Sequence, residues 1–577
     1  MPESARIRPR HARSLKYSSD PVMKISGKSA RWLAVGALSF CLRAQSPAPA
    51  RYDLVVQGGT LVDGSGGRAW QADVGVRGDR IAAIGDLKSA PRVRTIDARG
   101  LVVAPGFIDM HNHSDDSLLD EPKCESMIRQ GVTTMVLGEG ASQGPVLRNT
   151  KSDRPWSTLG GYFDYVEKKH AAENICSYVG ETQVWEYVKG EAMTPATPEE
   201  IEKMKEQVAL AMREGAMGLS TSLLMPPSNL ITTQQLIELA KVARQYGGLY
   251  STHMRDEGSG VFRSVEEAIN ISKGANIRVD IIHLKIADKK FWGQMNEIIS
   301  MINKARSEGY DVRTNVYPYT AGQNNLRAIV PPWAHDGGNA KMLERLKDPS
   351  QRPRLKHDIV NGLPNWYNHY LAVGGDWHAM LLVNLNNPKN KQFIGKRMSD
   401  VIAARGGDPV DDLLDLLIEE NGSVPTVYFH HSEPDMVYAL KQQYTSIGSD
   451  GSAMSPYGPR GKTMPHPRSY GTFPRLLGRY VREQHVISLE EAVHKMTAMN
   501  ADKLSITNRG RIQVGLAADI TLFDPDKVED KATFVQPHQF PVGIPYVIVN
   551  GQVVLDNGVH TGALPGRVLR GPGYVRN

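Results

Sequence analysis

Side chains that can bind a metal follow a series of apolar, strand-like runs, and this arrangement is the strongest constraint on the fold. His111 and His113 close the run that begins at Leu101. The others are Glu139 after residues 133–137, His253 after residues 248–252, His283 after residues 279–282 and Asp450 after residues 444–447. In a parallel (β/α)8 barrel all strands open on one face at their C-terminal ends. The pattern therefore predicts a TIM-like barrel that gathers these side chains in one small volume, as a metal site.

Strand-like runs alternate with helical patterns between residues 106 and about 505. Residues 198–213 and 233–244 space their apolar side chains three and four apart, behind a Pro or Thr start. Such βα repetition predicts a parallel sheet or barrel, so we assign the barrel domain to residues 106–505. From about residue 333 to 430 the alternation breaks, and we interpret that segment as an insertion over the barrel mouth that helps to shape a substrate pocket.

Short β runs separated by glycine turns occur at both ends of the chain. Residues 52–63 and 72–84 have this character, and so do residues 518–524 and 546–555. We expect the two groups to build one small β-sandwich from residues 51–105 and 506–577, with the barrel inserted between them. The fold class is therefore α/β, with an accessory β domain.

The charge and cysteine content exclude several classes of partner and site. Nine of the 68 Lys and Arg residues and two of the 62 Asp and Glu residues lie in residues 1–50, which leaves 59 basic and 60 acidic side chains in the rest. The body of the chain is thus neutral, and we expect no nucleic-acid partner. Only Cys41, Cys124 and Cys176 are present, with no CxxC pair, so neither a disulfide framework nor a thiolate zinc site is predicted.

Residues 1–50 are a basic tail whose pattern predicts a signal peptide that starts at Met23. Three basic residues follow Met23, then the apolar stretch 32–42, then a small-residue exit that ends at Ala50. The apolar stretch is too short to span a bilayer, and Phe40 before Cys41 makes a poor lipid-attachment motif. We expect a periplasmic or secreted protein without a stable membrane anchor; a cytoplasmic enzyme with a basic tail is the alternative.

A set of motifs in fixed order resembles one known family. They lie at residues 106–113, 215–221, 250–257, 283–285, 311–319, 448–451 and 465–474. Together they resemble the N-acyl-D-amino-acid deacylases (D-aminoacylases) of the amidohydrolase superfamily, from about residue 52 to residue 570. The resemblance implies a metal-dependent enzyme that acts on a small-molecule N-acyl amino acid.

The resemblance also implies a role for each candidate ligand. His111, His113 and Asp450 would face one metal position, and His253 and His283 another. Many D-aminoacylases have a bridging cysteine between the two positions, whereas this chain has Glu139, a harder ligand. Zn²⁺ is the expected metal for imidazole and carboxylate ligands in an open hydrolytic site, as one ion or two.

The chemistry of these groups predicts amide hydrolysis. A bound metal lowers the pKa of water and polarises an amide carbonyl, and Asp450 can accept the water's proton and return it to the leaving amine. The family resemblance further implies that Lys285, Tyr317 or Tyr319, and Arg468 hold the substrate's α-carboxylate.

Two other functions fit part of the sequence. The same barrel and ligands would serve an amidohydrolase that acts on cyclic amides or dipeptides, because the catalytic centre contacts only the scissile amide. A non-catalytic amidohydrolase-like scaffold is the second alternative, although a scaffold should have lost metal ligands. The sequence does not specify the acyl group, the side-chain preference or the oligomeric state.

Overall fold

The computed structural model describes residues 51–146, 154–190, 192–224 and 226–576. The basic tail and signal peptide expected at residues 1–50 lie outside the described residues. Within the described ranges, no helix combines the length and the apolar character needed to cross a membrane.

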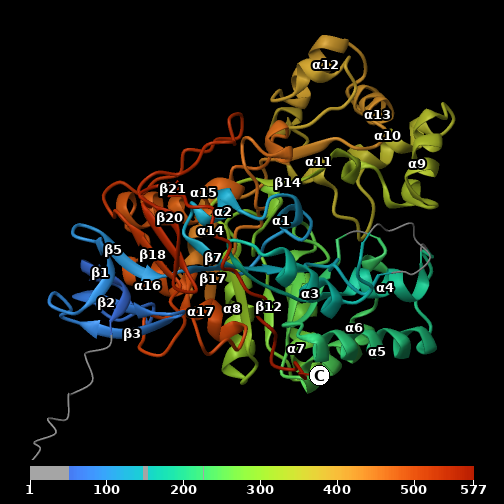
Figure 1. The fold of residues 1–577 in the computed structure, drawn as a ribbon. Helices are drawn as coiled ribbons and strands as arrows, with labels where there is room; N and C mark the ends of the chain where they lie inside the picture. The colour runs from blue at the N-terminus through green and yellow to red at the C-terminus, as the bar shows by residue number, and fades with distance from the viewer. Residues whose placement is uncertain (1–50, 147–153, 191, 225, 577) are drawn as a thin grey trace, which may run out of the picture. The chain divides into compact units, whose positions relative to one another are not determined.

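Parallel strands form a closed barrel. Its strands are β6 (Phe107–Asp109), β7 (Val132–Leu137), β8 (Asn174–Ser177) with β9 (Val179–Gly180), β10 (Gly218–Ser222), β11 (Leu249–His253), β12 (Val279–Ile281), β13 (Val312–Val316) and β17 (Thr445–Ile447). Of these, β7, β12 and β17 are labelled in Figure 1. Because β8 and β9 are two parts of one strand interrupted at Tyr178, the barrel has eight strands. A parallel bridge between Asn112 and Gly451 closes it between β6 and β17. The predicted TIM-like barrel is confirmed.

Helices between the strands cover the barrel. They include α3 (Leu159–Lys169), α5 (Pro198–Glu214), α6 (Thr233–Gln245), α7 (Val261–Ala275), α8 (Met295–Ser307), α14 (Glu433–Leu440) and α16 (Leu489–Met496). The helices expected at 198–213 and 233–244 are present as α5 and α6. Each begins with a capping box, Thr197 with Glu200 and Thr232 with Gln235, which satisfies backbone N–H groups that the first turn leaves open.

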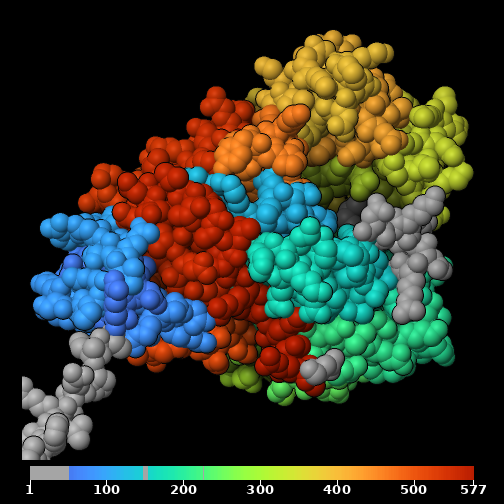
Figure 2. All heavy atoms as spheres, viewed as in Figure 1, coloured from blue at the N-terminus to red at the C-terminus, as the bar shows by residue number. Residues whose placement is uncertain are grey.

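Strands from both termini pair in a single sheet, in the part of the chain where we expected a small β-sandwich. From the N-terminal part come β1 (Tyr52–Leu61), β2 (Trp70–Arg77), β3 (Arg80–Gly85), β4 (Arg92–Asp97) and β5 (Val102–Pro105); from the C-terminal part come β18 (Ile520–Phe523), β19 (Tyr546–Val549), β20 (Gln552–Asp556) and β21 (Val559–His560). Antiparallel pairing of β5 with β18 joins the two halves. Val56, Val74, Ile520 and Ile548 meet in a common buried core, so neither half could bury its apolar face alone. Figure 2 shows the two halves side by side, in blue and red.

The chain passes from this sheet into the barrel at Gly106, between β5 and β6. A Cβ atom at this position would lie 2.2 Å from Thr133 Oγ1, so only glycine lets β6 approach β7 here. This close approach holds the start of β6 against β7, five residues before His111.

A separate apolar core is formed by residues between 326 and 428, a range that covers most of the segment 333–430 interpreted as an insertion. Its sheet is antiparallel, with β16 (Pro425–Tyr428) between β14 (Gly322–Asn325) and β15 (Met380–Leu382). Its longer helices are α9 (Gly338–Lys347), α10 (Arg352–Asn361), α12 (Met398–Arg405) and α13 (Pro409–Glu419). The segment appears in yellow and orange in Figure 1.

Candidate metal centre

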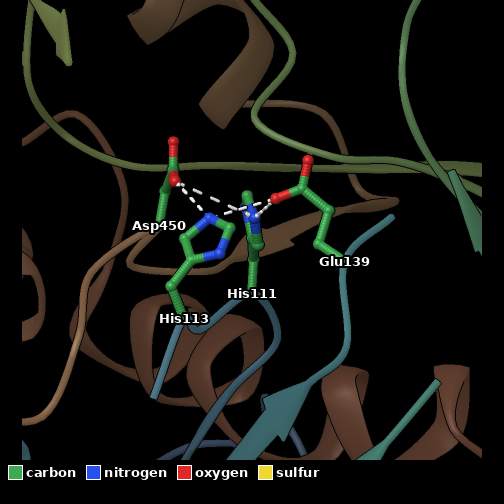
Figure 3. Close-up of side chains that lie close together, drawn as sticks. All are labelled: His111, His113, Glu139 and Asp450. Carbon is green, nitrogen blue, oxygen red and sulfur yellow. Dashed lines mark hydrogen bonds and ion pairs between the residues drawn. The ribbon is translucent and has the colours of Figure 1, made fainter. Parts of the chain in front are cut away.

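The first cluster of candidate ligands joins the N-terminal and C-terminal ends of the barrel sequence. His111, His113, Glu139 and Asp450 offer ligand atoms that all lie within 4.8 Å of one another, and their side chains converge in Figure 3. His113 Nε2 lies 3.0 Å from Glu139 Oε2 and 3.0 Å from Asp450 Oδ1. His111 Nε2 contacts the same Glu139 oxygen and lies 3.8 Å from Asp450 Oδ1.

The second cluster shares Glu139 with the first. Its members are Glu139, His253 and His283. His253 Nδ1 lies 3.2 Å from Glu139 Oε1 and 3.0 Å from His283 Nε2. Glu139 therefore directs one oxygen toward each cluster. The structure brings together all six predicted ligands in the grouping that the resemblance implies, while their binding of metal stays a prediction.

Two of these residues have an unusual backbone conformation. His283 (φ 40°) and Asp450 (φ 53°) both lie in the left-handed region, which costs a residue with a Cβ roughly 1–3 kcal/mol. The His283 N–H donates to Asn315 Oδ1 (2.9 Å), and the Asp450 N–H donates to the carbonyl of His111 (2.8 Å). These hydrogen bonds hold both residues in the turn that directs their side chains toward the other ligands.

Glu139 is held by the tight turn that follows β7. Gly138 (φ 85°) and Gly140 (φ 62°) flank it, and a Cβ on either glycine would lie within 2.6 Å of Ser177 or Ser222. Ser220 Oγ binds both sides of the turn, because it donates to the carbonyl of Gly138 and accepts from the N–H of Gly140 (3.0 Å). The glycines are thus required by the turn that presents the carboxylate.

The electrostatics of the site favour the metal-binding protonation states of Glu139, Asp450 and His283. Burial alone would raise the pKa of Glu139 and Asp450. Neighbouring histidines instead hold the pKa of the Glu139 carboxyl well below its usual range, and Arg468 together with histidines does the same for the pKa of Asp450. Burial and the Lys285 cation lower the pKa of His283 to about 4. Burial alone would lower the pKa of His113 and His253, but neighbouring carboxylates raise both. Anionic carboxylates and a neutral imidazole are the forms that bind metal ions. In addition, His253 Nδ1 and His283 Nε2 point at each other, and an ion between them would use both lone pairs. The residues present therefore fit a metal centre.

A cavity of about 570 Å³ opens beside the two clusters. Barrel-side residues in its wall include His113, Glu139, His253, His283, Asp450 and Arg468. The wall also contains Gln323, Asn324, Asn325, Asn384 and Pro425, which come from residues 322–428, the segment from β14 to β16. The candidate ligands thus lie at one side of a space large enough for a small molecule.

The four residues expected to hold a carboxylate have different positions. Arg468 lines the cavity, and its Nη1 donates to Asp450 Oδ2 (2.6 Å). Tyr317 is buried below Arg468, whose guanidinium lies 4.9 Å from the ring centre. The Tyr319 hydroxyl donates to Asp530 (3.3 Å), and Lys285 Nζ donates to Glu257 (2.6 Å). Among the described residues, the cavity wall includes Arg468 but not the other three, whose contact with substrate stays a prediction.

Two residues near the centre were not assigned from the sequence. Glu257 is buried and faces the outer nitrogens of His253 and His283. Its position four residues after His253 was the available signal. His466 lines the cavity but is fully engaged, because its Nε2 contacts the carbonyl of Ala321 (2.9 Å) and its Nδ1 accepts from the N–H of Arg468 (3.0 Å). It therefore positions Arg468 and is not available as a ligand.

Comparison with known proteins gives consistent matches over most of the chain. Residues 94–329 and 446–555 match the amidohydrolase family. A D-aminoacylase of Alcaligenes xylosoxydans xylosoxydans is 36% identical over 530 residues, which cover 90% of this chain and 97% of that protein. An N-acyl-D-aspartate deacylase of the same organism is 34% identical over 90% of this chain and 96% of its own length. The crystal structure of an N-acyl-D-glutamate deacylase from Bordetella bronchiseptica, complexed with zinc and a phosphonate inhibitor, is 29% identical, has a TM-score of 0.76, and is matched over 90% of this chain and 100% of that chain.

Proposed function

Because this chain belongs to the amidohydrolase family, and to the group of D-aminoacylases within it, we propose that it is a metal-dependent hydrolase that converts N-acyl-D-amino acids into a carboxylate and a free D-amino acid. The observation that carries the proposal is the arrangement of the six ligand-type side chains, with Asp450 between the His113 imidazole and the Arg468 guanidinium at the cavity wall.

A bound divalent metal supplies two effects, a lower pKa for water and polarisation of the scissile carbonyl. Asp450 performs the proton transfer. Its carboxylate is anionic and opens on the cavity, so it accepts a proton from the attacking water and gives that proton to the amine nitrogen as the amide C–N bond breaks. The new C–O bond belongs to the released carboxylate, and the amine leaves as part of the D-amino acid.

Arg468 binds the substrate's α-carboxylate. It is the one Lys or Arg in the wall of the cavity among the described residues, and a guanidinium pairs with a carboxylate through two parallel hydrogen bonds. Since Arg468 also donates to Asp450, it joins substrate binding to the position of the proton-transfer group. Arg468→Ala should therefore raise KM for substrates with a free α-carboxylate and leave KM unchanged for an α-amide analogue. Equal increases of KM for both compounds would show that Arg468 does not bind the α-carboxylate.

Zn²⁺ is the metal that this ligand set favours, because imidazole and carboxylate groups in an open hydrolytic site suit it. Removal of metal by a chelator should abolish hydrolysis, and Zn²⁺ should restore it. Elemental analysis of the purified protein identifies the ion and its stoichiometry.

A panel of N-acetyl-D- and N-acetyl-L-amino acids, together with metal analysis of the same sample, tests the reaction. We expect turnover of D substrates that depends on metal. Hydrolysis confined to cyclic imides or to L-dipeptides would contradict the deacylase function and leave the metal centre intact.

The chain is also proposed to be exported from the cytoplasm. The support is the order of basic, apolar and small residues from Met23 to Ala50. Terminal sequencing of protein from the native host should find a start between Ala44 and Arg51. A cytoplasmic product that retains Met1 or Met23 would contradict export.

A further inference from the structure

We propose that Glu257 is a positioning residue that orients both histidines of the second metal position, His253 and His283, with Lys285 as its counter-ion. The inference rests on the metal centre of the proposed function. It assigns to Glu257 no contact with substrate.

Each of the two imidazoles directs one ring nitrogen toward the other imidazole and its second nitrogen toward Glu257. His253 Nδ1 and His283 Nε2 face each other at 3.0 Å, on the side of Glu139. The remaining nitrogens face Glu257: His283 Nδ1 lies 3.1 Å from Oε1, and His253 Nε2 lies 3.6 Å from Oε2. One carboxylate thus spans the outer edges of both rings, one oxygen to each.

At His253 this contact selects the tautomer that can bind a metal. At His283 the Lys285 ammonium also lies 2.8 Å from Nδ1, so Glu257 there fixes the position of the ring. A ring nitrogen that donates a hydrogen to Glu257 leaves the lone pair on the other nitrogen, which is the atom that faces Glu139. His253 Nε2 is buried and has no hydrogen-bond partner among the described residues, so Glu257 Oε2 is the acceptor available to it. Carboxylates that accept from ligand histidines raise the basicity of the ring and hold it in place, and their loss typically costs about 10- to 100-fold in metal affinity.

The Lys285 cation offsets the free-energy cost of burying the Glu257 carboxylate. Glu257 is 4% exposed, and Lys285 Nζ donates to its Oε1 (2.6 Å). Without a partner cation, a carboxylate at this depth would be costly to bury. Lys285 also lies 2.8 Å from His283 Nδ1, so the cation, the carboxylate and the ring edge form one compact group behind the ligands.

In the first metal position, His111 lacks this arrangement. His111 Nδ1, the outer nitrogen of its ring, is buried and has no hydrogen-bond partner among the described residues. Removing the Glu257 carboxylate should therefore affect the two positions unequally, which separates a positioning role from a general loss of structure.

Zn²⁺ affinity, measured by competition with a chelator, tests the proposal in two backgrounds. His113→Ala disables the first position and leaves the second, whereas His283→Ala does the reverse. Adding Glu257→Gln should weaken Zn²⁺ binding by about 10- to 100-fold in the His113→Ala background and leave it unchanged in the His283→Ala background. Unchanged affinity in both backgrounds, or equal losses in both, would overturn the proposal.

Glu181 offers a matched control, because it is a fully buried carboxylate just after β9 that accepts from Ser228 Oγ (2.5 Å) and faces neither histidine. Glu181→Gln should leave both Zn²⁺ affinities unchanged. Thermal unfolding of the metal-free variants checks that each is folded. If Glu257→Gln does not fold, Glu257→Asp keeps the charge for Lys285 but withdraws the oxygens, and it should also weaken the second position; wild-type affinity would refute the proposal.

Zn²⁺ affinity and hydrolysis are separate measurements, so the role of Glu257 and the deacylase activity can fail independently. A protein that binds Zn²⁺ with this dependence on Glu257 but does not hydrolyse N-acyl-D-amino acids would contradict the deacylase activity alone. A deacylase whose second position is indifferent to Glu257→Gln would contradict the positioning role alone.

Discussion

At the residue scale, the two carboxylate oxygens of Asp450 have different partners. One oxygen faces the histidines, and the other accepts a hydrogen bond from Arg468. Its Oδ1 lies 3.0 Å from His113 Nε2, and its Oδ2 accepts from Arg468 Nη1 at 2.6 Å. The left-handed backbone at Asp450 maintains this orientation. A carboxylate held between two cationic or metal-facing groups remains anionic and ready to accept a proton.

Asp450→Asn should lower kcat by about 10²- to 10⁴-fold or more, because the amide cannot accept the proton that general base catalysis requires. The ligands of the second metal position are untouched, so about one ion per chain should persist. Steady-state kinetics and metal analysis on one preparation measure both quantities. A variant with near wild-type kcat would exclude Asp450 as the proton-transfer group.

Glu139 is the single residue shared by both clusters, so its substitution should affect both. Glu139→Gln keeps the shape of the side chain but removes the negative charge that faces His111, His113 and His253. We expect metal content and turnover to fall together. Full metal content with full turnover in this variant would show that Glu139 is not a ligand.

At the element scale, the short helix α17 (Ala498–Lys503) connects barrel strands through the hydrogen bonds of its last residue, Lys503. Lys503, which is fully buried, donates to Asp280 on β12 (2.6 Å), to the carbonyl of Thr314 on β13 (2.6 Å) and to Ser446 on β17 (2.8 Å). Asp280 in turn accepts from Asn315, which accepts from the N–H of His283. A chain of polar contacts therefore leads from the barrel interior to a metal ligand.

Lys503→Ala should destabilise the protein by about 3–5 kcal/mol, because it leaves the Asp280 carboxylate buried without its cation. Lys527→Ala is the control: it removes an exposed partner of Asp524, an interaction worth about 0–1 kcal/mol. Urea unfolding of the two variants compares them. Equal shifts of the unfolding midpoint would mean that the buried pair contributes no more than a surface one.

The cavity is a property of the whole molecule, because its two walls come from distant parts of the chain. The barrel contributes the ligands and Arg468, and the 322–428 segment contributes the amide side chains Gln323, Asn324, Asn325 and Asn384. Among the described residues no second Lys or Arg lines it. Once Arg468 holds the α-carboxylate, the described part of the wall offers no further cation to an acidic side chain.

We therefore expect N-acyl-D-amino acids with neutral side chains to be preferred, unlike in the related N-acyl-D-aspartate deacylase. N-acetyl-D-glutamine and N-acetyl-D-glutamate make a matched pair that differs in charge. The kcat/KM ratio should favour glutamine by about 100-fold, since leaving a buried carboxylate unpaired costs about 3 kcal/mol or more. Equal kcat/KM values would show that a cation reaches the side-chain site.

Local patterns in the sequence determined the barrel, the sheet built from both termini, and the helices α5 and α6. Hydrophobic period and capping residues depend on neighbours within a few positions, so they can be read from the chain directly. The predicted ligands also followed from local order, because the ends of parallel strands share one face and each candidate stands where a strand-like run ends.

Tertiary structure alone decided which atoms of these residues meet. The sequence did not reveal that Glu257 faces both outer histidine nitrogens, that Lys285 lies behind His283 and outside the cavity wall, or that Gln323 and Asn384 line the cavity. Such contacts join residues from different elements, and they depend on ring orientation, on left-handed turns and on how the 322–428 segment packs. Periodicity places a side chain on a face, whereas only the packed molecule fixes the partner of each nitrogen and oxygen.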